Sequence, residues 1–352
     1  MEPIPRGLSL AAQTCAVLRQ LIVSGGFERT LPGEMELVRR LKVSRVTLRT
    51  ALAQLEREGL LRGSKGRRRE ITVSAPGRVK PRACPSRVII LSPVSLTGLI
   101  SSKLLWMDEL RDILSAQGVA LDFVVSTAAF LQRPGRVLHS LRAQYPDTVW
   151  LLLRSTAHMQ RWFFEQRVPV VVAGSLFEGI ELPGVDSDYF AGCRHAAGRL
   201  IARGCRRLGL LTPQPMLAGD RESEAGFREG AGDIPVAVAR HDGTPDGLCR
   251  VLDELMKSQP PHGLLVFHAT HAATALTRLI STGWRLPRDL KLLSRDDDPF
   301  LHHLSPRPAR YTVAPQPFAR QLAKFVRSFL DASLPPAEAC RLLPEFTAGE
   351  TL

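Results

Sequence analysis

From residue 87 onward, the sequence alternates between short apolar runs and longer amphipathic stretches. The runs are rich in Val, Ile and Leu and four to six residues long, which is typical of buried strands. Most of the stretches between them place apolar residues at helical spacing. Strands joined through helices lie parallel and need helices on both faces of their sheet, so this region is predicted to be α/β. Periodicity leaves open one large sheet, a barrel or two doubly wound lobes. The expected strands are Val88–Leu91, Leu121–Val125, Val149–Leu153, Val168–Ala173, Leu208–Leu211, Ile234–Ala239, Gly263–Phe267 and Leu290–Leu293, and the expected helices include Leu104–Gln117, Tyr189–Arg203, Gly247–Lys257 and Thr270–Thr282.

A proline-rich segment separates this α/β pattern from the residues before it. Residues 74–86 contain three prolines, one glycine and little hydrophobic periodicity, which is typical of a linker. We therefore expect an N-terminal domain over residues 1–74, a linker over 75–86 and a larger domain over 87–352.

The segment before the linker has the pattern of three helices followed by a hairpin. The first helix ends near Gly25, and the second follows the Leu-Pro-Gly run that ends at Gly33. Ser44 is the expected N-cap of the third helix, because its hydroxyl can accept a hydrogen bond from a free N–H of the first turn. The basic stretch Leu60–Val73 contains glycines and closes with β-forming residues, so it is predicted to be the hairpin.

The net charge of +13 is concentrated in the N-terminal quarter of the chain. Residues 1–86 carry 17 Lys and Arg against seven Glu and no Asp, a net charge of +10, whereas residues 87–352 carry +3. A basic module attached to a nearly neutral body indicates that the module binds a polyanion such as nucleic acid.

Several other classes of protein do not fit the sequence. No apolar run approaches the roughly 18 residues of a membrane-spanning helix, and polar residues interrupt the apolar segment Leu8–Val23, which no signal-peptide cleavage site follows. The six cysteines are scattered without a Cys-x-x-Cys pair, as expected of reduced thiols in a cytoplasmic protein. We expect no enzyme and no cofactor, because the common nucleotide-binding and hydrolase motifs are missing. His268 and His271 stand three apart, but no nearby Glu or Cys completes a ligand set, so no metal site is expected.

The second and third expected helices have the layout of a helix-turn-helix, in which the later helix enters the major groove of DNA. An Arg side chain can donate two parallel hydrogen bonds to guanine, and a Thr can contact a base or a phosphate. At the hairpin tip, glycine permits close approach of the backbone and basic side chains reach phosphate or the minor groove. The candidate DNA-binding residues are Ser44, Arg45, Thr47, Arg49, Lys65, Gly66 and Arg67.

Two runs in this segment resemble the GntR family of bacterial transcription regulators. Residues 31–37 read Leu-Pro-Gly-Glu-Met-Glu-Leu and resemble the family's Leu-Pro-Ser-Glu-Arg-Glu-Leu, and residues 43–49 read Val-Ser-Arg-Val-Thr-Leu-Arg and resemble its Val-Ser-Arg-x-Thr-Val-Arg. The resemblance covers about residues 8–73 and implies a winged helix-turn-helix with operator contacts from Arg45, Thr47, Arg49, Lys65 and Gly66. Met35 departs from it, because the family usually has Arg or Lys there to contact phosphate. That contact is therefore not carried over.

The larger domain resembles the ligand-binding domain of the LacI/GalR repressors. The segments that carry this resemblance are Val185–Tyr189, Gly204–Leu211, Arg221–Gly230, Gly283–Leu290 and Asp296–Pro299. The resemblance implies two doubly wound lobes, like those of periplasmic sugar-binding proteins, with a ligand cleft between them.

Ligands of open α/β sheets bind beyond the carboxyl ends of the strands, so the loops after the expected strands supply the candidate effector site. Carboxylates and an Arg can bind sugar hydroxyls in pairs, and an aromatic such as Trp106 can stack on a sugar ring. The candidate residues are Ser92, Ser95, Asp188, Arg221, Ser223, His268, Thr270 and Asp296.

Four positions in or beside the expected cleft depart from the LacI/GalR pattern. Ser223 stands where the family has a ligand-contacting Arg, and Ala269-Thr270 replace its Asn-Asp pair. Arg295 replaces an aromatic beside a glycine. Either the effector differs from the usual sugars or tight binding has been lost, and Arg221 is a possible substitute for the missing Arg.

The predicted function is a ligand-responsive, sequence-specific transcription regulator. We expect a cytoplasmic homodimer that binds double-stranded operator DNA and represses a sugar-utilisation operon until a small sugar-like effector releases it. Two alternatives stay open. One is a DNA-binding dimer whose cleft domain no longer binds a ligand, and the other is a sugar-processing α/β enzyme fused to a DNA-binding domain.

Overall fold

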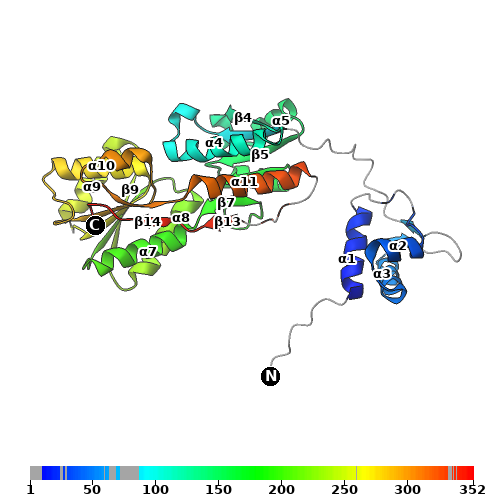
Figure 1. Ribbon diagram of the computed structural model, residues 1–352. Coiled ribbons are helices and arrows are strands. Elements are labelled where there is room, and N and C mark those ends of the chain that lie inside the picture. The colour runs from blue at the N-terminus through cyan, green and yellow to red at the C-terminus, as the bar shows by residue number, and fades with distance from the viewer. Residues whose placement is uncertain are drawn as a thin grey trace, which may run out of the picture. The chain divides into compact units, whose positions relative to one another are not determined.

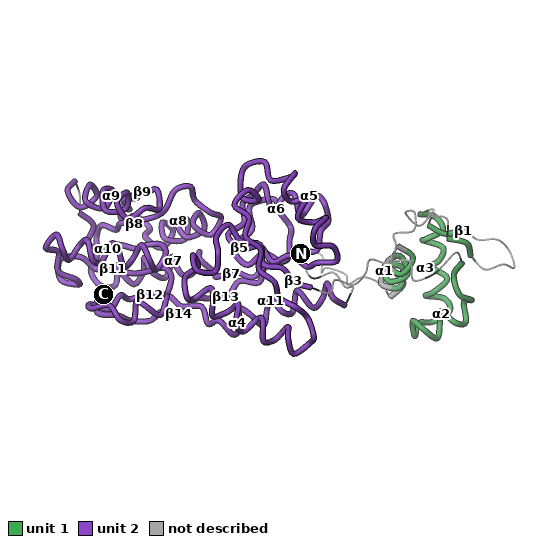
Figure 2. The backbone as a smooth tube through the Cα atoms, turned by 90° about the horizontal axis from the view of Figure 1, so that it is seen from above, with its two compact units in different colours: residues 1–82 green, residues 83–352 purple. Residues whose placement is uncertain are grey.

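The computed structural model describes residues 10–23, 27, 30–58, 60–62, 69–71, 87–258, 260–331, 335, 337 and 339–352. Contacts divide the chain into two compact units, Met1–Arg82 and Ala83–Leu352, which Figure 2 shows in different colours. The expected linker over residues 75–86 lies outside the described residues, as do the expected wing residues Lys65, Gly66 and Arg67.

The N-terminal unit contains three helices and a short hairpin, in the order that the sequence predicts (Figure 1). The elements are α1 (Leu10–Val23), α2 (Glu34–Leu41), α3 (Arg45–Arg57), β1 (Leu61–Arg62) and β2 (Glu70–Ile71). The two strands pair antiparallel, with Leu61 opposite Ile71. Ser44 caps α3, because its Oγ accepts a hydrogen bond from the backbone N–H of Thr47 at 3.1 Å. The helix-turn-helix and the N-cap are therefore confirmed.

The core of this unit forms where α1 packs against α3. Leu18 on α1 and Leu48, Leu52 and Leu55 on α3 are fully buried. Because these α3 residues repeat at helical spacing, they turn one face of the helix inward and leave the opposite face to solvent.

The larger unit contains two six-stranded sheets. The first sheet is entirely parallel, in the order β13 (Ala339–Leu342), β7 (Gly184–Ser187), β6 (Val170–Ala173), β5 (Thr148–Leu153), β3 (Arg87–Ser92) and β4 (Ala120–Val125). The second has the order β14 (Glu345–Thr347), β12 (Ala309–Thr312), β11 (Lys291–Ser294), β10 (Gly263–Val266), β8 (Leu208–Pro213) and β9 (Val236–His241), with only β14 antiparallel to its neighbour.

Helices cover both faces of each sheet (Figure 1). The first sheet packs against α4 (Ser101–Ser115) and α11 (Pro315–Leu330) on one face and α5 (Gly135–Gln144) and α6 (Ala157–Glu165) on the other. The second packs against α7 (Tyr189–Ala202) and α8 (Ala218–Ala231) on one face and α9 (Pro245–Ser258) and α10 (Ala269–Ser281) on the other. We call these two assemblies the first and second lobes. The predicted doubly wound architecture of two lobes is thus confirmed.

Within the described residues, the chain passes between the lobes three times. It leaves the first sheet after β7, returns from β12 into α11, and leaves again between β13 and β14. Two of these passages are tied together where the backbone N–H of Asp188 donates to the carbonyl oxygen of Leu342 at 2.8 Å. A hydrogen bond from the Ser102 N–H to the Asp298 carboxylate, at 3.1 Å, also joins the lobes.

The helices α7 and α8 pack unusually closely in the second lobe. A Cβ atom placed on Gly226 would lie 2.2 Å from the carbonyl oxygen of Phe190, and the next residue, Phe227, is fully buried. The Gly-Phe pair of the LacI/GalR resemblance therefore has a packing role, because only glycine permits this approach of the two backbones.

Candidate functional site

A cavity of about 200 Å³ lies between the two lobes of the larger unit. The first lobe contributes the start of α4 and the ends of β5 and β6, and the second lobe contributes the start of α8 and the ends of β10 and β11. An adjoining cavity of about 240 Å³ shares Lys103, Tyr189 and Arg295 with it. The walls are thus made by the carboxyl ends of parallel strands, where doubly wound folds bind ligands.

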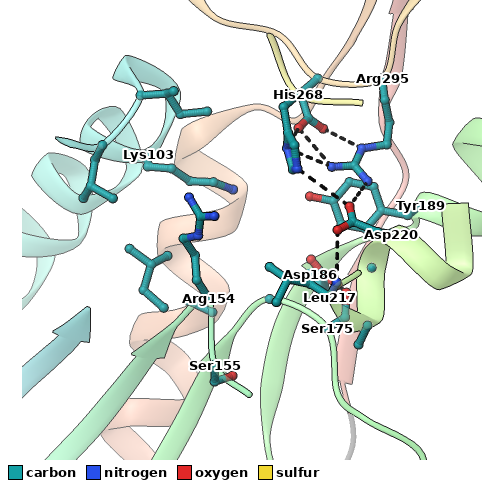
Figure 3. Close-up of a pocket in the computed structure, with 18 of the residues that line it drawn as sticks. Lys103, Arg154, Ser155, Ser175, Asp186, Tyr189, Leu217, Asp220, His268 and Arg295 are labelled. Carbon is teal, nitrogen blue, oxygen red and sulfur yellow. Dashed lines mark hydrogen bonds and ion pairs between the residues drawn. The ribbon is translucent and has the colours of Figure 1, made fainter. Parts of the chain in front are cut away.

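Arg295, at the end of β11, is the centre of a buried polar cluster on the wall of the second lobe (Figure 3). Its Nη1 donates to Asp220 Oδ1 at 2.7 Å and to Ser223 Oγ at 3.1 Å. Its Nε donates to Asp296 Oδ1 at 3.1 Å. Because the Arg295 side chain is only 5% exposed, these charge-assisted hydrogen bonds are shielded from water and hold the guanidinium in one orientation.

Two aromatic rings sandwich the same guanidinium. Its central carbon lies 4.4 Å from the ring centroid of Phe267 and 4.5 Å from that of Tyr189. Burial is the largest single effect and would raise the pKa values of Asp220 and Asp296, but the charge of Arg295, the charge of His268 and the hydrogen bonds together outweigh it and lower both. Both carboxylates are therefore ionised at neutral pH and already paired.

His268 extends this cluster from the end of β10. Its φ of 63° lies in the left-handed region, which a residue without special constraint rarely adopts. Its Nδ1 lies 3.1 Å from Asp296 Oδ2. The neighbouring His271 has a pKa lowered to about 3. Its burial is the largest cause, and the charges of His268 and His241 add to it. His271 is therefore a neutral imidazole at physiological pH.

Asp186 is the acidic group on the first-lobe side of the cavity. It lies on β7, is 5% exposed, and accepts a hydrogen bond from the hydroxyl of Ser175. Burial raises the pKa of Asp186 to about 6, against the opposing effect of the Ser175 hydrogen bond. This carboxyl group therefore titrates closer to neutral pH than an exposed Asp does.

Two cations, Lys103 and Arg154, line the first-lobe wall opposite the Arg295 cluster (Figure 3). Lys103 lies in the first turn of α4, and Arg154 directly follows β5. Neither side chain makes a hydrogen bond or an ion pair within the part of the chain that the structure describes. The cavity thus combines a satisfied polar cluster on one wall with two unpaired cations on the other.

The candidate DNA-binding surface is at the start of α3. Arg45 and Arg49 are exposed there, while Thr47 is half-buried. The Arg45 Nη2 lies 2.6 Å from the sulfur of Met35 on α2. The Arg49 Nε donates to Glu34 Oε2 at 2.9 Å. Both guanidinium groups are therefore held near the surface without being buried.

Comparisons with known proteins agree with both halves of this description. Residues 10–71 match the model of the gntR family of bacterial regulatory proteins, and residues 197–352 match that of a periplasmic binding protein-like domain. The chain is therefore similar to gntR-family regulators over its N-terminal residues and to periplasmic binding protein-like domains over its C-terminal residues. Part of it is 29% identical, over 226 residues, to the HTH-type transcriptional regulator CelR of Thermobifida fusca. That match covers 59% of this chain and 66%, just under two thirds, of the relative.

Solved structures of LacI-family regulators share the fold of the two lobes. The transcription regulator CcpA of Lactococcus lactis has a TM-score of 0.65 and 15% identity, covering 76% of this chain and 98% of its own. A LacI-family regulator from Enterococcus faecium with bound ribose has a TM-score of 0.63 and 18% identity, covering 75% and 98%. One from Arthrobacter sp. FB24 in complex with lactose has a TM-score of 0.62 and 16% identity, covering 76% and 98%.

Of the effector-site candidates, the structure brings His268, Thr270 and Asp296 together in the cavity wall of the larger unit. Ser92 is fully buried and its hydroxyl bonds to Val94, so it faces no cavity. Asp188 caps α7 by accepting from the N–H of Ala191. These two residues have local structural roles.

Three further candidates also lie away from the main cavity. Arg221 is exposed on α8 and is not among the residues that line either cavity. Ser95 is exposed beyond the end of β3. Trp106 lies in the adjoining cavity and packs on Phe318, with ring centroids 5.3 Å apart. The idea that Arg221 replaces the missing Arg therefore receives no support from its position.

Arg295 supplies a guanidinium beside the position where the LacI/GalR resemblance expects an Arg. Ser223 is fully buried and contributes only a hydroxyl, which the Arg295 Nη1 reaches at 3.1 Å. The two departures at positions 223 and 295 thus offset each other, because an Arg on the neighbouring strand end points at the small residue on α8.

Several cavity residues were missed in the sequence, namely Lys103, Arg154, Ser175, Asp186, Tyr189 and Asp220. Arg154 and Ser175 come one and two residues after predicted strands, so the rule that identified His268 also applies to them. Asp186 gave no such signal, since it lies within a strand that was not predicted. None of the described residues forms a group of three or more His, Cys, Asp or Glu that could hold a metal ion. Among the described helices, none is long and apolar enough to cross a membrane.

Proposed function

We propose that this chain is a ligand-responsive transcription regulator, in which the gntR-family domain binds operator DNA and the cleft of the larger unit binds a small, sugar-like effector. The observation that carries the proposal is the presence, in one chain, of a capped recognition helix with exposed arginines and a two-lobed domain with a polar cavity. We further propose that it represses a sugar-utilisation operon until the effector binds.

The DNA-binding half of the proposal is supported by geometry and charge. Ser44 fixes the start of α3, so Arg45, Thr47 and Arg49 follow one another along its first turns. Arg49 lies on the exposed face, and its side chain is 68% exposed in spite of its bond to Glu34. An exposed ion pair of this kind contributes little, about 0–1 kcal/mol, so a DNA contact can replace it. Lys65, Gly66 and Arg67 complete the proposed contact set as the wing.

Operator selection followed by affinity measurement tests this half. Random double-stranded DNA is selected on the full-length protein, and Kd for the selected site is measured by fluorescence anisotropy. Arg45→Ala should weaken binding by about 1–3 kcal/mol and relax discrimination at one base position. Arg57→Ala, at the opposite end of the same helix, is the matched control and should bind like the parent. If the Arg45 and Arg49 variants both keep parental affinity, the assignment of α3 as the recognition helix is wrong.

The effector-binding half is supported by the position of the cavity. Because both lobes line it, a small molecule bound there contacts both walls at once and favours the arrangement in which the lobes are closest. Such differential binding is what couples a ligand to a conformational equilibrium. Asp296, His268 and Thr270 are the proposed contacts from the second lobe.

A homodimer is part of the proposal, since two half-sites need two recognition helices. Exposed apolar side chains on the first lobe support it: Leu96, Leu104 and Leu105 surround a shallow groove on α4, and Val125 is exposed at the end of β4. Contiguous apolar surface of this kind is typical of interaction sites. Sedimentation of the free protein measures the oligomeric state.

The alternative of a cleft that has lost its ligand was suggested by Ser223. The Arg295 guanidinium beside that residue, and the ordered polar network around it, favour a binding cleft instead. The relative and the solved neighbours named above are transcription regulators, which favours a regulator over a sugar-processing enzyme. Turnover of a sugar phosphate by the purified protein would support the enzyme alternative.

A further inference from the structure

The two cations on the first-lobe wall are the unexplained groups of the cleft. Lys103 and Arg154 come from different elements, α4 and the end of β5, yet both line the same cavity. Figure 3 shows their head groups pointing toward one another, in the part of the cavity that faces the Arg295 cluster. Lys103 is half-buried and Arg154 is exposed, so water screens their repulsion only in part, and an anion between them would remove it.

The charge of Lys103 acts on Asp186 and favours its ionised form, but within the described residues no acidic group of the cavity forms an ion pair with either cation, and each has a closer partner. Asp220 and Asp296 are bound by Arg295 at 2.7 and 3.1 Å. Asp186 accepts the hydroxyl hydrogen of Ser175. By contrast, no described residue accepts a hydrogen bond from the Lys103 ammonium or the Arg154 guanidinium.

The unused hydrogen-bonding capacity of the first-lobe wall therefore consists of donors. An ammonium group has three N–H donors, and a guanidinium has five in a planar fork that matches a carboxylate or a phosphate. The buried indole N–H of Trp106, in the adjoining cavity, also lacks an acceptor within the described residues. A ligand that satisfies these groups must offer several acceptor oxygens.

The backbone at Arg154 is a second, independent sign that this cation is placed for a purpose. Its φ is 55°, in the left-handed region that a non-glycine residue seldom adopts. The next residue, Ser155, is buried and accepts a hydrogen bond from Gln160 Nε2 at 2.9 Å, which anchors the loop. Strained positions held by well-packed neighbours are concentrated at ligand sites.

From these observations we infer that the effector is an anionic sugar or polyol, whose carboxylate or phosphate group binds Lys103 and Arg154 while its hydroxyls face the second lobe. The inference rests on the proposed function of the cleft as an effector site. The anion is held by the first lobe, and the hydroxyls meet Asp296 and His268, so one molecule spans the cleft. In the ligand-free protein the two cations repel each other, and a bound anion removes that repulsion.

Matched pairs of ligands test the inference on the full-length protein. Each pair contains a neutral pentose or hexose and its acidic derivative: glucose with gluconate, glucuronate and glucose 6-phosphate, and the corresponding sets for galactose, ribose and arabinose. Thermal shift identifies binders, and titration calorimetry gives Kd. Inorganic phosphate and acetate serve as probes of the charged group alone. We expect at least one acidic member to stabilise the protein far more than its neutral parent does.

Variants then locate the charge-recognising groups. Lys103→Gln and Arg154→Gln should each weaken binding of the acidic ligand roughly 10- to 100-fold, as loss of a charge-assisted hydrogen bond implies, and should leave binding of a neutral parent nearly unchanged. Arg154→Lys keeps the charge but loses the planar fork, so its loss should be smaller. Arg161→Gln, an exposed cation on α6 that does not line the cavity, removes the same charge elsewhere and should bind like the parent.

The outcomes separate this inference from the function on which it rests. If a neutral sugar binds as tightly as its acid, or if the two Gln variants bind the acid like the parent, the cleft is an effector site but the anionic effector is wrong. If no member of the panel stabilises the protein, the proposed effector function itself fails and this inference fails with it. A preference for the acid that both Gln variants abolish and Arg161→Gln retains supports the inference.

Discussion

Replacing Arg295 with Met removes the guanidinium that the buried carboxylate of Asp220 and the half-buried carboxylate of Asp296 share. Asp220 and Asp296 would remain, and the Asp220 side chain is only 3% exposed, so water cannot replace the lost partner. Breaking a buried ion pair by deleting one member costs about 3–5 kcal/mol, because the other charge is left uncompensated. We expect a loss of this size in the free energy of unfolding of the larger unit at pH 7.5.

The pH dependence of this loss follows from the pKa shifts. Arg295 lowers the pKa values of both carboxyls in the folded protein, so the stability that they contribute is present above the ordinary Asp pKa of about 4 and is lost only at more acidic pH. Without Arg295, burial dominates and raises both pKa values, so the variant gains stability as protonation neutralises the carboxyls. The difference between parent and variant should therefore shrink between pH 7.5 and pH 5.

Urea unfolding monitored by tryptophan fluorescence measures this effect, because all four tryptophans lie in residues 87–352. Arg221→Met is the matched control, since that side chain is exposed, and it should change stability by no more than about 0.5 kcal/mol. A loss below about 1 kcal/mol for Arg295→Met, or a loss that is the same at both pH values, would refute the account of the cluster as a buried, charge-compensated network.

Two further substitutions test features of the fold. Gly226→Ala should destabilise the larger unit by about 1–3 kcal/mol or more, because its Cβ would lie 2.2 Å from the Phe190 carbonyl oxygen. Gly198→Ala is the control, since Gly198 also lies in a helix but has open space around it, and it should stabilise the unit by roughly 0.5–1 kcal/mol. Thermal unfolding that gives both variants the same sign contradicts the packing argument. The folded pKa of Asp186 is about 6, above that of an exposed Asp, so ionisation of this carboxyl lowers the stability of the parent as pH rises from about 4 through 6. Asp186→Asn cannot ionise and should therefore be more stable than the parent by about 1–3 kcal/mol at pH 8. The gain should vanish near pH 4 in denaturant titrations, and a gain independent of pH would show that charge is not its cause.

Most strands of the larger unit could be predicted because they are buried on both faces. Val88 and Ile90 turn to one set of helices, and Ile89 and Leu91 turn to the other, so apolar residues follow one another without interruption. Strands β7, β12, β13 and β14 were not predicted. They are three or four residues long and contain charged or polar residues, since they form a sheet edge or a passage between lobes.

The site was predictable only where a single strand end defines a position. His268, Thr270 and Asp296 follow two predicted strands and do line the cavity. The relation between Ser223 and Arg295 was not visible, because it depends on how α8 lies against the end of β11, 72 positions away in sequence. Lys103 likewise reaches the cavity only because α4 of the first lobe begins at the cleft.

The three passages between the lobes have a consequence for how the chain is made. The first lobe begins with β3 at Arg87, yet its covering helix α11 and its edge strand β13 are supplied by residues 315–342. During synthesis from the N-terminus, the apolar surface of α4 that includes Trp106 and Leu110 has no α11 to cover it until those residues emerge. The second lobe from α7 to β12 is encoded between the two halves of the first, so all of it except β14 and the residues after it is translated before the first lobe can close. Nascent chains that lack α11 should therefore bind chaperones through the exposed face of α4.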